Sequence, residues 1–126
     1  MPGIGLITAT WIVVATMNFT LCADASKAVA YAGLAPMPRA SGTSVHQRPC
    51  IGHSGNGRLR TALYLATLSA ARFNPVIKTF YDRLRAGGKP TKVARCAAAR
   101  KLLHLASALV THQKDFDPLC RQQDAA

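Results

Sequence analysis

The second half of the chain repeats apolar residues at helical spacing. Asn56 or Ser54 can accept backbone N–H groups as an N-cap just before the segment from 57 to 73. One face of that segment is apolar, which predicts an amphipathic helix; its members are Leu59, Leu63, Ala66 and Ala70.

A second helix is predicted from 75 to 86. Asn74 supplies its cap, Pro75 is suited to a first helical turn, and Gly87-Gly88 ends the segment. We expect its buried residues to be Val76, Phe80 or Tyr81, and Leu84.

A last helix is predicted from about 92 to 111, with Thr91 as its cap. One side of it is basic: Lys92, Arg95, Arg100, Lys101 and His104. The other side is expected to be an apolar stripe of Val93, Cys96, Ala97, Leu103, Ala106 and Val110.

The start of the chain is apolar and carries no charged side chain before Asp24. The segment from 6 to 17 is rich in β-branched residues and would also suit a strand, but its length and the preceding Gly5 favour a helix, which we expect to be buried. A membrane span or export signal is the alternative. Threonines interrupt the apolar run and no Lys or Arg precedes it, so neither is preferred.

A short helix is expected next, capped by Asp24 or Ser26 and ended by Gly33. The segment from 34 to 55 that follows is rich in Pro and Gly, which predicts a long loop or extended segment of a kind that is often functional. The turn Pro2-Gly3-Ile4-Gly5 is helix-hairpin-helix-like, and its backbone N–H groups could hold a phosphate. The expected fold class is therefore all-α, a small bundle of about five helices with a long catalytic-type loop.

The charge pattern narrows the choice of partners. The chain has 126 residues with 16 Lys and Arg against 5 acids, all Asp, and a net charge of +11. Such an excess repels itself unless an anion neutralises it. Nucleic acid is the preferred partner, and an anionic membrane surface is the rival.

The cysteines, at 22, 50, 96 and 120, show no recognisable metal or redox spacing and are expected to be reduced. Cys50-x-x-His53, with His46 nearby, falls short of the four ligands of a structural zinc site. We therefore expect no metal and no cofactor in this chain.

Candidate chemistry gathers in the long loop. Ser41, Thr43 and Ser44 offer hydroxyls there, and a serine nucleophile needs a base, a metal or positive charge to help its alkoxide. Arg58 and Arg60 follow in a first helical turn, where cations are disfavoured unless an anion lies between them and the helix end. We expect the hydroxyl and these arginines to lie close together as a phosphate site. The residues alone do not rank the three hydroxyls.

The sequence resembles a known family through blocks that follow one another along the chain. They are Ala30-Tyr-Ala-Gly-Leu-Ala-Pro-x-Pro-Arg-x-Ser-Gly-Thr-Ser44, Gly55-Asn-x-Arg-Leu-Arg60, Ala71-Arg-Phe-Asn-Pro75, Phe80-Tyr-x-Arg-Leu-Arg85 and Gly88-Lys-Pro90. They look like the C-terminal domain of insertion-sequence transposases of the one-ten family, the group that includes one-sixteen and nine-oh-two. The resemblance runs from about Pro2 to Pro118.

The resemblance implies a function in DNA transposition and recombination. In that family a RuvC-like domain binds magnesium through four carboxylates, and the C-terminal domain supplies a serine that attacks a DNA phosphodiester; here the matching residue is Ser41. The implied phosphate contacts are Arg39, Arg48, Arg58 and Arg60, and the implied turn residues are Gly3, Gly5, Gly42, Gly55 and Asn56.

The resemblance also implies partners: DNA, a structured guide RNA, and other copies of the chain or a RuvC-like domain. It implies a cytoplasmic bacterial protein, bound to the nucleoid through DNA, with no membrane partner. We expect a truncated transposase with its domain at 1–118 and a disordered tail at 119–126, inactive alone because magnesium belongs to the partner domain. The alternative is a non-catalytic basic helical module that binds DNA or RNA.

Overall fold

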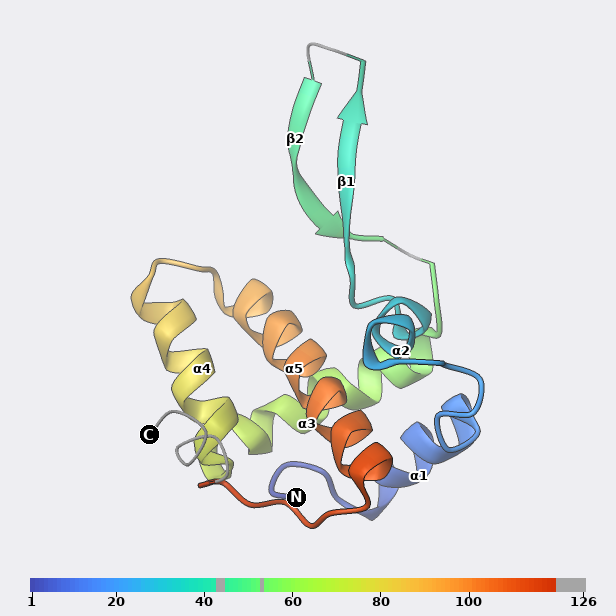
Figure 1. The fold of residues 1–126 in the computed structure, drawn as a ribbon. Helices are drawn as coiled ribbons and strands as arrows, with labels where there is room; N and C mark the ends of the chain where they lie inside the picture. Colours follow the sequence, from blue (N-terminus) through green and yellow to red (C-terminus); the bar gives the residue numbers. More distant parts are fainter. Residues whose placement is uncertain (43–44, 53, 120–126) are drawn as a thin grey trace.

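Five helices and one β-hairpin make up the part of the chain described by the computed structural model, which covers residues 1–42, 45–52 and 54–119 (Figure 1). Within the hairpin, the side chains at 38–41 and 45–49 are left undescribed. The elements are α1 (Leu6–Thr16), α2 (Ala25–Ala32), β1 (Pro36–Ser41), β2 (Val45–Ile51), α3 (Gly57–Phe73), α4 (Pro75–Ala86) and α5 (Thr91–His112). The expected all-α class is confirmed.

Helix α3 is central, since α1, α2, α4 and α5 all contact it. Its predicted apolar face is confirmed, because Leu59, Leu63, Ala66 and Ala70 are all buried. The first two join a core formed with α1, α2 and α5, and the last two join a second core formed with α4 and α5. One helix therefore connects both halves of the bundle.

The expected core of α4 is wrong. Ile77 is its buried residue, at 0% exposure, and packs with Ala66, Ala70, Ala98 and Leu102. The four residues named from the sequence are only half-buried: Val76, Phe80, Tyr81 and Leu84. Apolar side chains occur on neighbouring faces of α4, so the sequence does not show which face is buried. The positions of α3 and α5 decide it.

The predicted stripe of α5 is only partly right: Leu103 is buried, and Cys96, Ala97 and Ala106 are half-buried. Val93 and Val110 are exposed, whereas its buried positions are Ala94, Ala98, Ala99, Leu102, Leu103 and Ser107. The alanines allow α2, α3 and α4 to approach α5 closely, so its contact face combines small residues with Leu102 and Leu103 and leaves the valines outside. Its N-cap is Pro90 without a side-chain bond, and Thr91 is the first helical residue.

Helix α1 is not buried as expected. Ile12 and Thr16 are its buried residues, while Leu6 and Ile7 are 85% and 76% exposed. The reason is that α1 has one helical neighbour, α3, so most of its circumference meets no other helix. Among the described residues, no helix combines the length and apolar character needed to cross a membrane.

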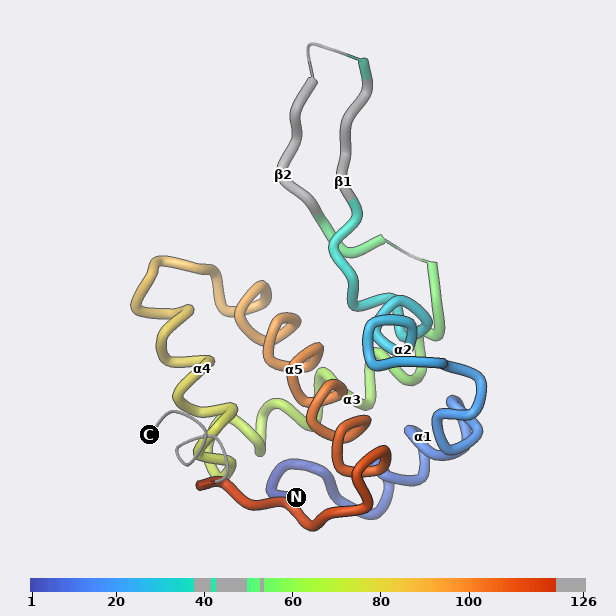
Figure 2. The backbone as a smooth tube through the Cα atoms, in the orientation of Figure 1, coloured from blue at the N-terminus to red at the C-terminus, as the bar shows by residue number. Residues whose placement is uncertain are grey.

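The helix starts use side-chain caps where the sequence offered them. Asp24 accepts from the N–H of Lys27, and Asn56 accepts from that of Leu59, at 2.8 and 3.0 Å. Asn74 is fully buried and accepts from two N–H groups of α4. Its amide also donates to the carbonyl of Pro2 at 3.0 Å, which holds the amino-terminal turn against the α3–α4 corner (Figure 2).

Candidate nucleic-acid interface

The long segment between α2 and α3 forms an antiparallel hairpin that projects from the helices (Figure 1). The extended form was among the sequence expectations, but the pairing of its halves was not. Pro36 pairs with Ile51 at the root and Ser41 with Val45 at the far end, with an irregularity between Met37 and Arg39. Gly42 follows at φ +70°, a left-handed conformation that glycine adopts without strain.

Ser41 therefore ends β1 at the tip of the hairpin. Arg39 lies on β1 and Arg48 on β2, but their side chains and that of Ser41 are outside the described set. Thr43, Ser44 and His53 lie outside the described residues altogether.

The structure does not bring Ser41 next to Arg58 and Arg60. Those arginines are in the first turn of α3, beyond the root of the hairpin (Figure 1). Six strand residues span roughly 16 Å, so pairing of β1 with β2 carries Ser41 away from the helix start. The expected single cluster is thus divided between tip and root.

The root of the hairpin is a tight crossing of two chain segments. The N–H of Asn56 donates to the carbonyl of Tyr31 at 2.8 Å, and Arg60 Nη1 donates to the carbonyl of Ser54 at 3.1 Å. A Cβ on Gly55 would lie 2.7 Å from the backbone N of Gly33. Arg60 therefore supports the crossing directly.

A depression of about 930 Å³ lies beside this crossing, between α1 and the start of α3. Arg58, which is exposed, and Arg60 line it together with Trp11 from α1. Sequence reasoning did not single out Trp11. A lone aromatic in an apolar helix carries no signal of its own until the fold sets it beside arginines.

The turn residues occupy distinct places. Gly5 is the N-cap residue of α1, and Gly3 has φ +94° where a Cβ would overlap Ala70 of α3. Gly55 is also left-handed, at φ +88°. The turn at residues 2–5 is thus held against α3.

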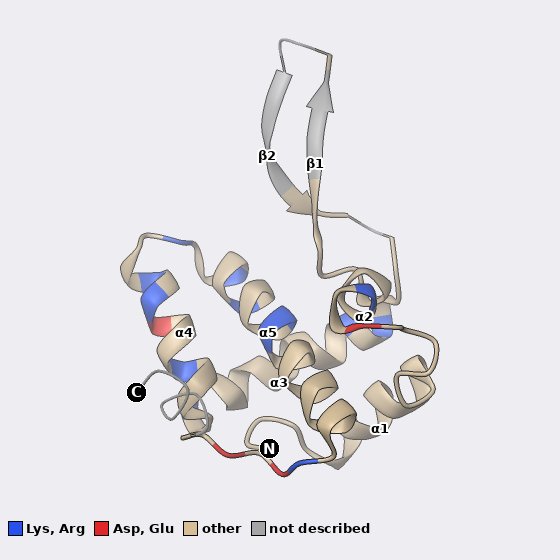
Figure 3. Cartoon of the chain, in the orientation of Figure 1, with Lys and Arg blue, Asp and Glu red and all other residues tan. Residues whose placement is uncertain are grey.

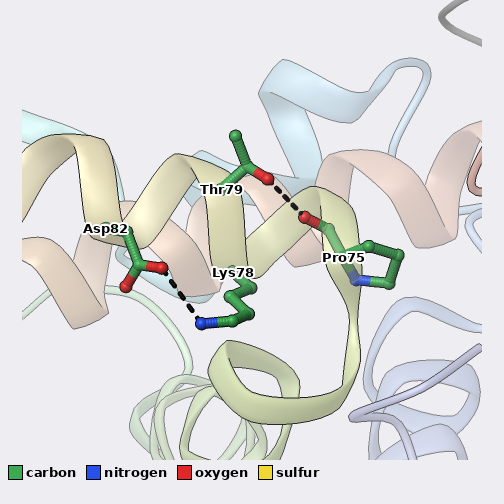
Figure 4. A network of polar contacts seen from close by, with 4 residues as sticks. All are labelled: Pro75, Lys78, Thr79 and Asp82. Carbon is green, nitrogen blue, oxygen red and sulfur yellow. Dashed lines mark hydrogen bonds and ion pairs between the residues drawn. The ribbon is translucent and has the colours of Figure 1, made fainter.

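Positive charge dominates the described surface (Figure 3). Blue segments recur along α4 and the first half of α5, and α1 carries no charged residue. On α4, Lys78 and Asp82 form an ion pair at 3.2 Å beside the bond from Thr79 to the Pro75 carbonyl (Figure 4). One exposed ion pair of this kind offsets little of the net positive charge.

Arg95 lies on α5 with two tyrosines. The side chain of Tyr64 on α3, with a further contribution from Tyr81 on α4, raises the pKa of Arg95. No group of three or more His, Cys, Asp or Glu side chains that could hold a metal ion occurs among the described residues. The site can therefore offer hydroxyl, backbone and cationic groups.

Residues 1–82 match the protein family described as Transposase IS116/IS110/IS902 family. The chain belongs to that family. A protein of insertion element IS110 from Streptomyces coelicolor is 34% identical over 87% of this chain and 27% of its own length. The pilin gene-inverting protein of Moraxella bovis is 35% identical over 93% of this chain and 37% of its own length.

A protein of insertion element IS900 from Mycobacterium paratuberculosis is likewise 35% identical, over 94% of this chain and 30% of its own length. The chain thus spans about a third of the length of these curated relatives. The family resemblance drawn from the sequence blocks is confirmed.

Proposed function

We propose that this chain is the serine-bearing, DNA-binding part of a transposase and that Ser41 is its nucleophile. The observation that carries the proposal is the position of Ser41 at the tip of a hairpin that projects from a strongly basic helical body. Relatives named for insertion elements and for inversion of the pilin gene support it, since both names describe rearrangements of DNA.

In the proposed step, Ser41 Oγ forms a bond to a DNA phosphorus while the bond from that phosphorus to one sugar oxygen breaks. The serine proton passes to solvent or a base, and the released sugar oxygen takes up a proton. The strand is then held as a phosphoserine ester until a second hydroxyl reverses the step. The arginines of the hairpin and of α3 would balance phosphate charge along the bound strand.

The described residues do not fit a metal site, since no cluster of metal-ligating side chains occurs among them. The proposal therefore assigns magnesium to carboxylates of a RuvC-like domain outside this sequence and predicts no cleavage by the chain alone. It places the protein in the bacterial cytoplasm with its DNA, together with a guide RNA and further copies of the chain.

The test supplies the chain with the RuvC-like domain of a longer relative, magnesium, the RNA encoded by that element and labelled DNA. A covalent protein–DNA adduct that survives denaturation is expected for the wild-type chain and for Ser54→Ala. Ser41→Ala should abolish it, because the proposal assigns the ester to the Ser41 hydroxyl and not to those of Thr43 and Ser44. An adduct that persists in Ser41→Ala would show that Ser41 is not the nucleophile.

A non-catalytic nucleic-acid-binding module is the second candidate, favoured by the charge of +11. It predicts binding that weakens steeply with salt, as phosphate contacts require. Arg58→Gln should weaken binding and Ser41→Ala should not. Salt-sensitive binding without any adduct in the complete mixture would select this candidate over the first.

A further inference from the structure

A cavity of about 440 Å³ lies where the root of the hairpin meets α5 and the end of α4. Leu34 and Ile51 line it from the hairpin side, and Val93 and Ala97 line it from α5. Its size falls within the usual range for small-molecule and cofactor pockets, about 300 to 1,000 Å³. It is separate from the depression next to Arg58.

The wall of this cavity is apolar and partly open to solvent. Leu34 is buried, and Ile51 packs against the same core. Val93, however, is 51% exposed in the first turn of α5, next to the buried Ala94. An exposed valine over a cavity offers a surface on which a flat apolar group can lie.

Three cations surround that apolar wall: Lys89, Lys92 and Arg100, all exposed. None of the described residues that line the cavity is acidic. Lys92 and Arg100 are separated by two turns of α5, about 12 Å along its axis, so they do not converge on one point. This spread suits several phosphates in a chain better than one free anion.

We propose that this cavity, the root pocket, holds one unpaired nucleotide of a bound nucleic-acid strand. Its base lies against Val93 and Ile51, and the neighbouring phosphates contact Lys89, Lys92 and Arg100. Bases of single strands stack on aromatic side chains along cationic grooves, and an unstacked base can also lie between apolar side chains, whereas a duplex keeps its bases stacked inside. A strand held here would continue along the hairpin that carries Ser41.

This inference rests on the proposed nucleic-acid binding and adds where an unpaired segment is held. The protein's own cysteines test it, because Cys50 and Cys96 line the root pocket and are partly exposed, whereas Cys22 is buried. Burial raises the pKa of the Cys96 thiol, so alkylation is best followed at about pH 8.5, where more thiolate is present. Mass spectrometry then reports each cysteine separately.

The probes are a single-stranded DNA and a single-stranded RNA of about 15 nucleotides, each added to the full chain. We expect at least one of them to slow alkylation of Cys50 and Cys96 by at least about fivefold, and a blunt DNA duplex of the same sequence to protect neither thiol. The probe that protects identifies the source of the nucleotide as DNA or RNA.

Two variants locate the phosphates. Lys92→Gln with Arg100→Gln should reduce the salt dependence of single-strand binding by about 1.4 in log–log slope, since each phosphate contact on a single strand contributes about 0.7. The matched control is Lys27→Gln with Lys114→Gln, which removes the same charge at two exposed positions away from the root pocket. Circular dichroism checks that both proteins remain folded.

A third variant tests the base. Val93→Ala should weaken binding of the ordinary strand by several-fold, because the base loses its contact with the valine side chain. Binding of an abasic strand should not change, because that strand has no base to make the contact. Val14→Ala, at another exposed valine, should change neither.

Two results would overturn the root-pocket inference and leave the proposed function standing. One is an equal loss of salt dependence in the Lys92/Arg100 and Lys27/Lys114 variants. The other is a bound single strand that leaves Cys50 and Cys96 unprotected. Protection of the thiols by the duplex and by neither single strand would also overturn the root-pocket inference. Failure of every nucleic acid to bind would overturn both.

Discussion

Two glycines allow the hairpin to leave the helical body. Gly33 ends α2 and Gly55 precedes α3, and their backbones lie against each other at the root. Both have positive φ, so a side chain at either would meet conformational strain as well as backbone atoms. The position of the hairpin therefore depends on single residues.

Gly55→Ala should lower the free energy of unfolding by at least about 2 kcal/mol, from left-handed strain and from a Cβ set 2.7 Å from the Tyr31 carbonyl oxygen. Urea unfolding followed by helical circular dichroism measures it. Gly57→Ala is the matched control: its Cβ meets only an ordinary contact with Arg60, and stability should rise by up to about 1 kcal/mol. Similar effects at both positions would refute the crossing as described.

Asn74 joins the amino-terminal turn to the α3–α4 corner, and its loss should be costly. Asn74→Ala removes a cap and leaves the Pro2 carbonyl without its donor, so a loss of about 2 to 3 kcal/mol is expected. Asn74→Ser keeps a capping oxygen and should lose only about 1 kcal/mol. Both variants remove the amide that donates to the Pro2 carbonyl, so equal losses by thermal unfolding would mean that the capping oxygen contributes nothing.

At the scale of elements, α1 has apolar residues on all its sides, interrupted only by threonines, but packs along one side. Ile12 is 4% exposed and lies in the core, whereas Val14 on the same helix is 65% exposed. Such a helix has no polar face by which the sequence could indicate its inner side. Its inner side is set by the core that it shares with α2, α3 and α5.

Ile12→Ala should therefore cost about 2 to 4 kcal/mol of unfolding free energy, because it leaves a cavity in the core. Val14→Ala should stay within about 0.5 kcal/mol, because its side chain is already in water. The two variants are compared by their denaturant midpoints, provided that the unfolding free energy depends on denaturant concentration with the same slope in both. A larger loss at Val14 would show that another surface covers that side of α1.

At the scale of the whole molecule, the charge of +11 acts on every conformation of the chain. The described residues contribute few compensating ion pairs, so like charges repel across the folded surface. Salt screens this repulsion: the Debye length falls from about 30 Å at 0.01 M to about 10 Å at 0.1 M. Stability and nucleic-acid binding should thus respond to salt in opposite directions.

The melting temperature of the free chain should rise by about 3 °C or more over that salt range, since relief of about 1 kcal/mol moves Tm by several degrees in a small domain. Scanning calorimetry measures the shift. Lys27→Glu with Lys114→Glu replaces two positive charges by two negative ones, lowering the net charge from +11 to +7, and should reduce the response. A melting temperature that falls with salt would mean that attractive pairs dominate.

Much of the helical framework could be predicted from the sequence, because its signals are local. Helices α3 and α4 begin and end as their caps, proline and glycines indicated. The faces of α4 and α5 could not be predicted, since alanine and valine positions compete for the same core. Nor could the root pocket, because Lys89 and Ile51 come from segments far apart in the chain.

The sequence by itself determined the helices, the basic character and the family blocks, since each depends on short-range pattern or composition. Only the tertiary structure decided that residues 36–51 pair as a hairpin, that Ser41 lies at its tip, and that Arg58 and Arg60 remain near its root. The physical reason is that strand pairing and helix packing are long-range choices. The local sequence pattern is compatible with several strand pairings and helix packings, and only the complete set of tertiary contacts selects one of them.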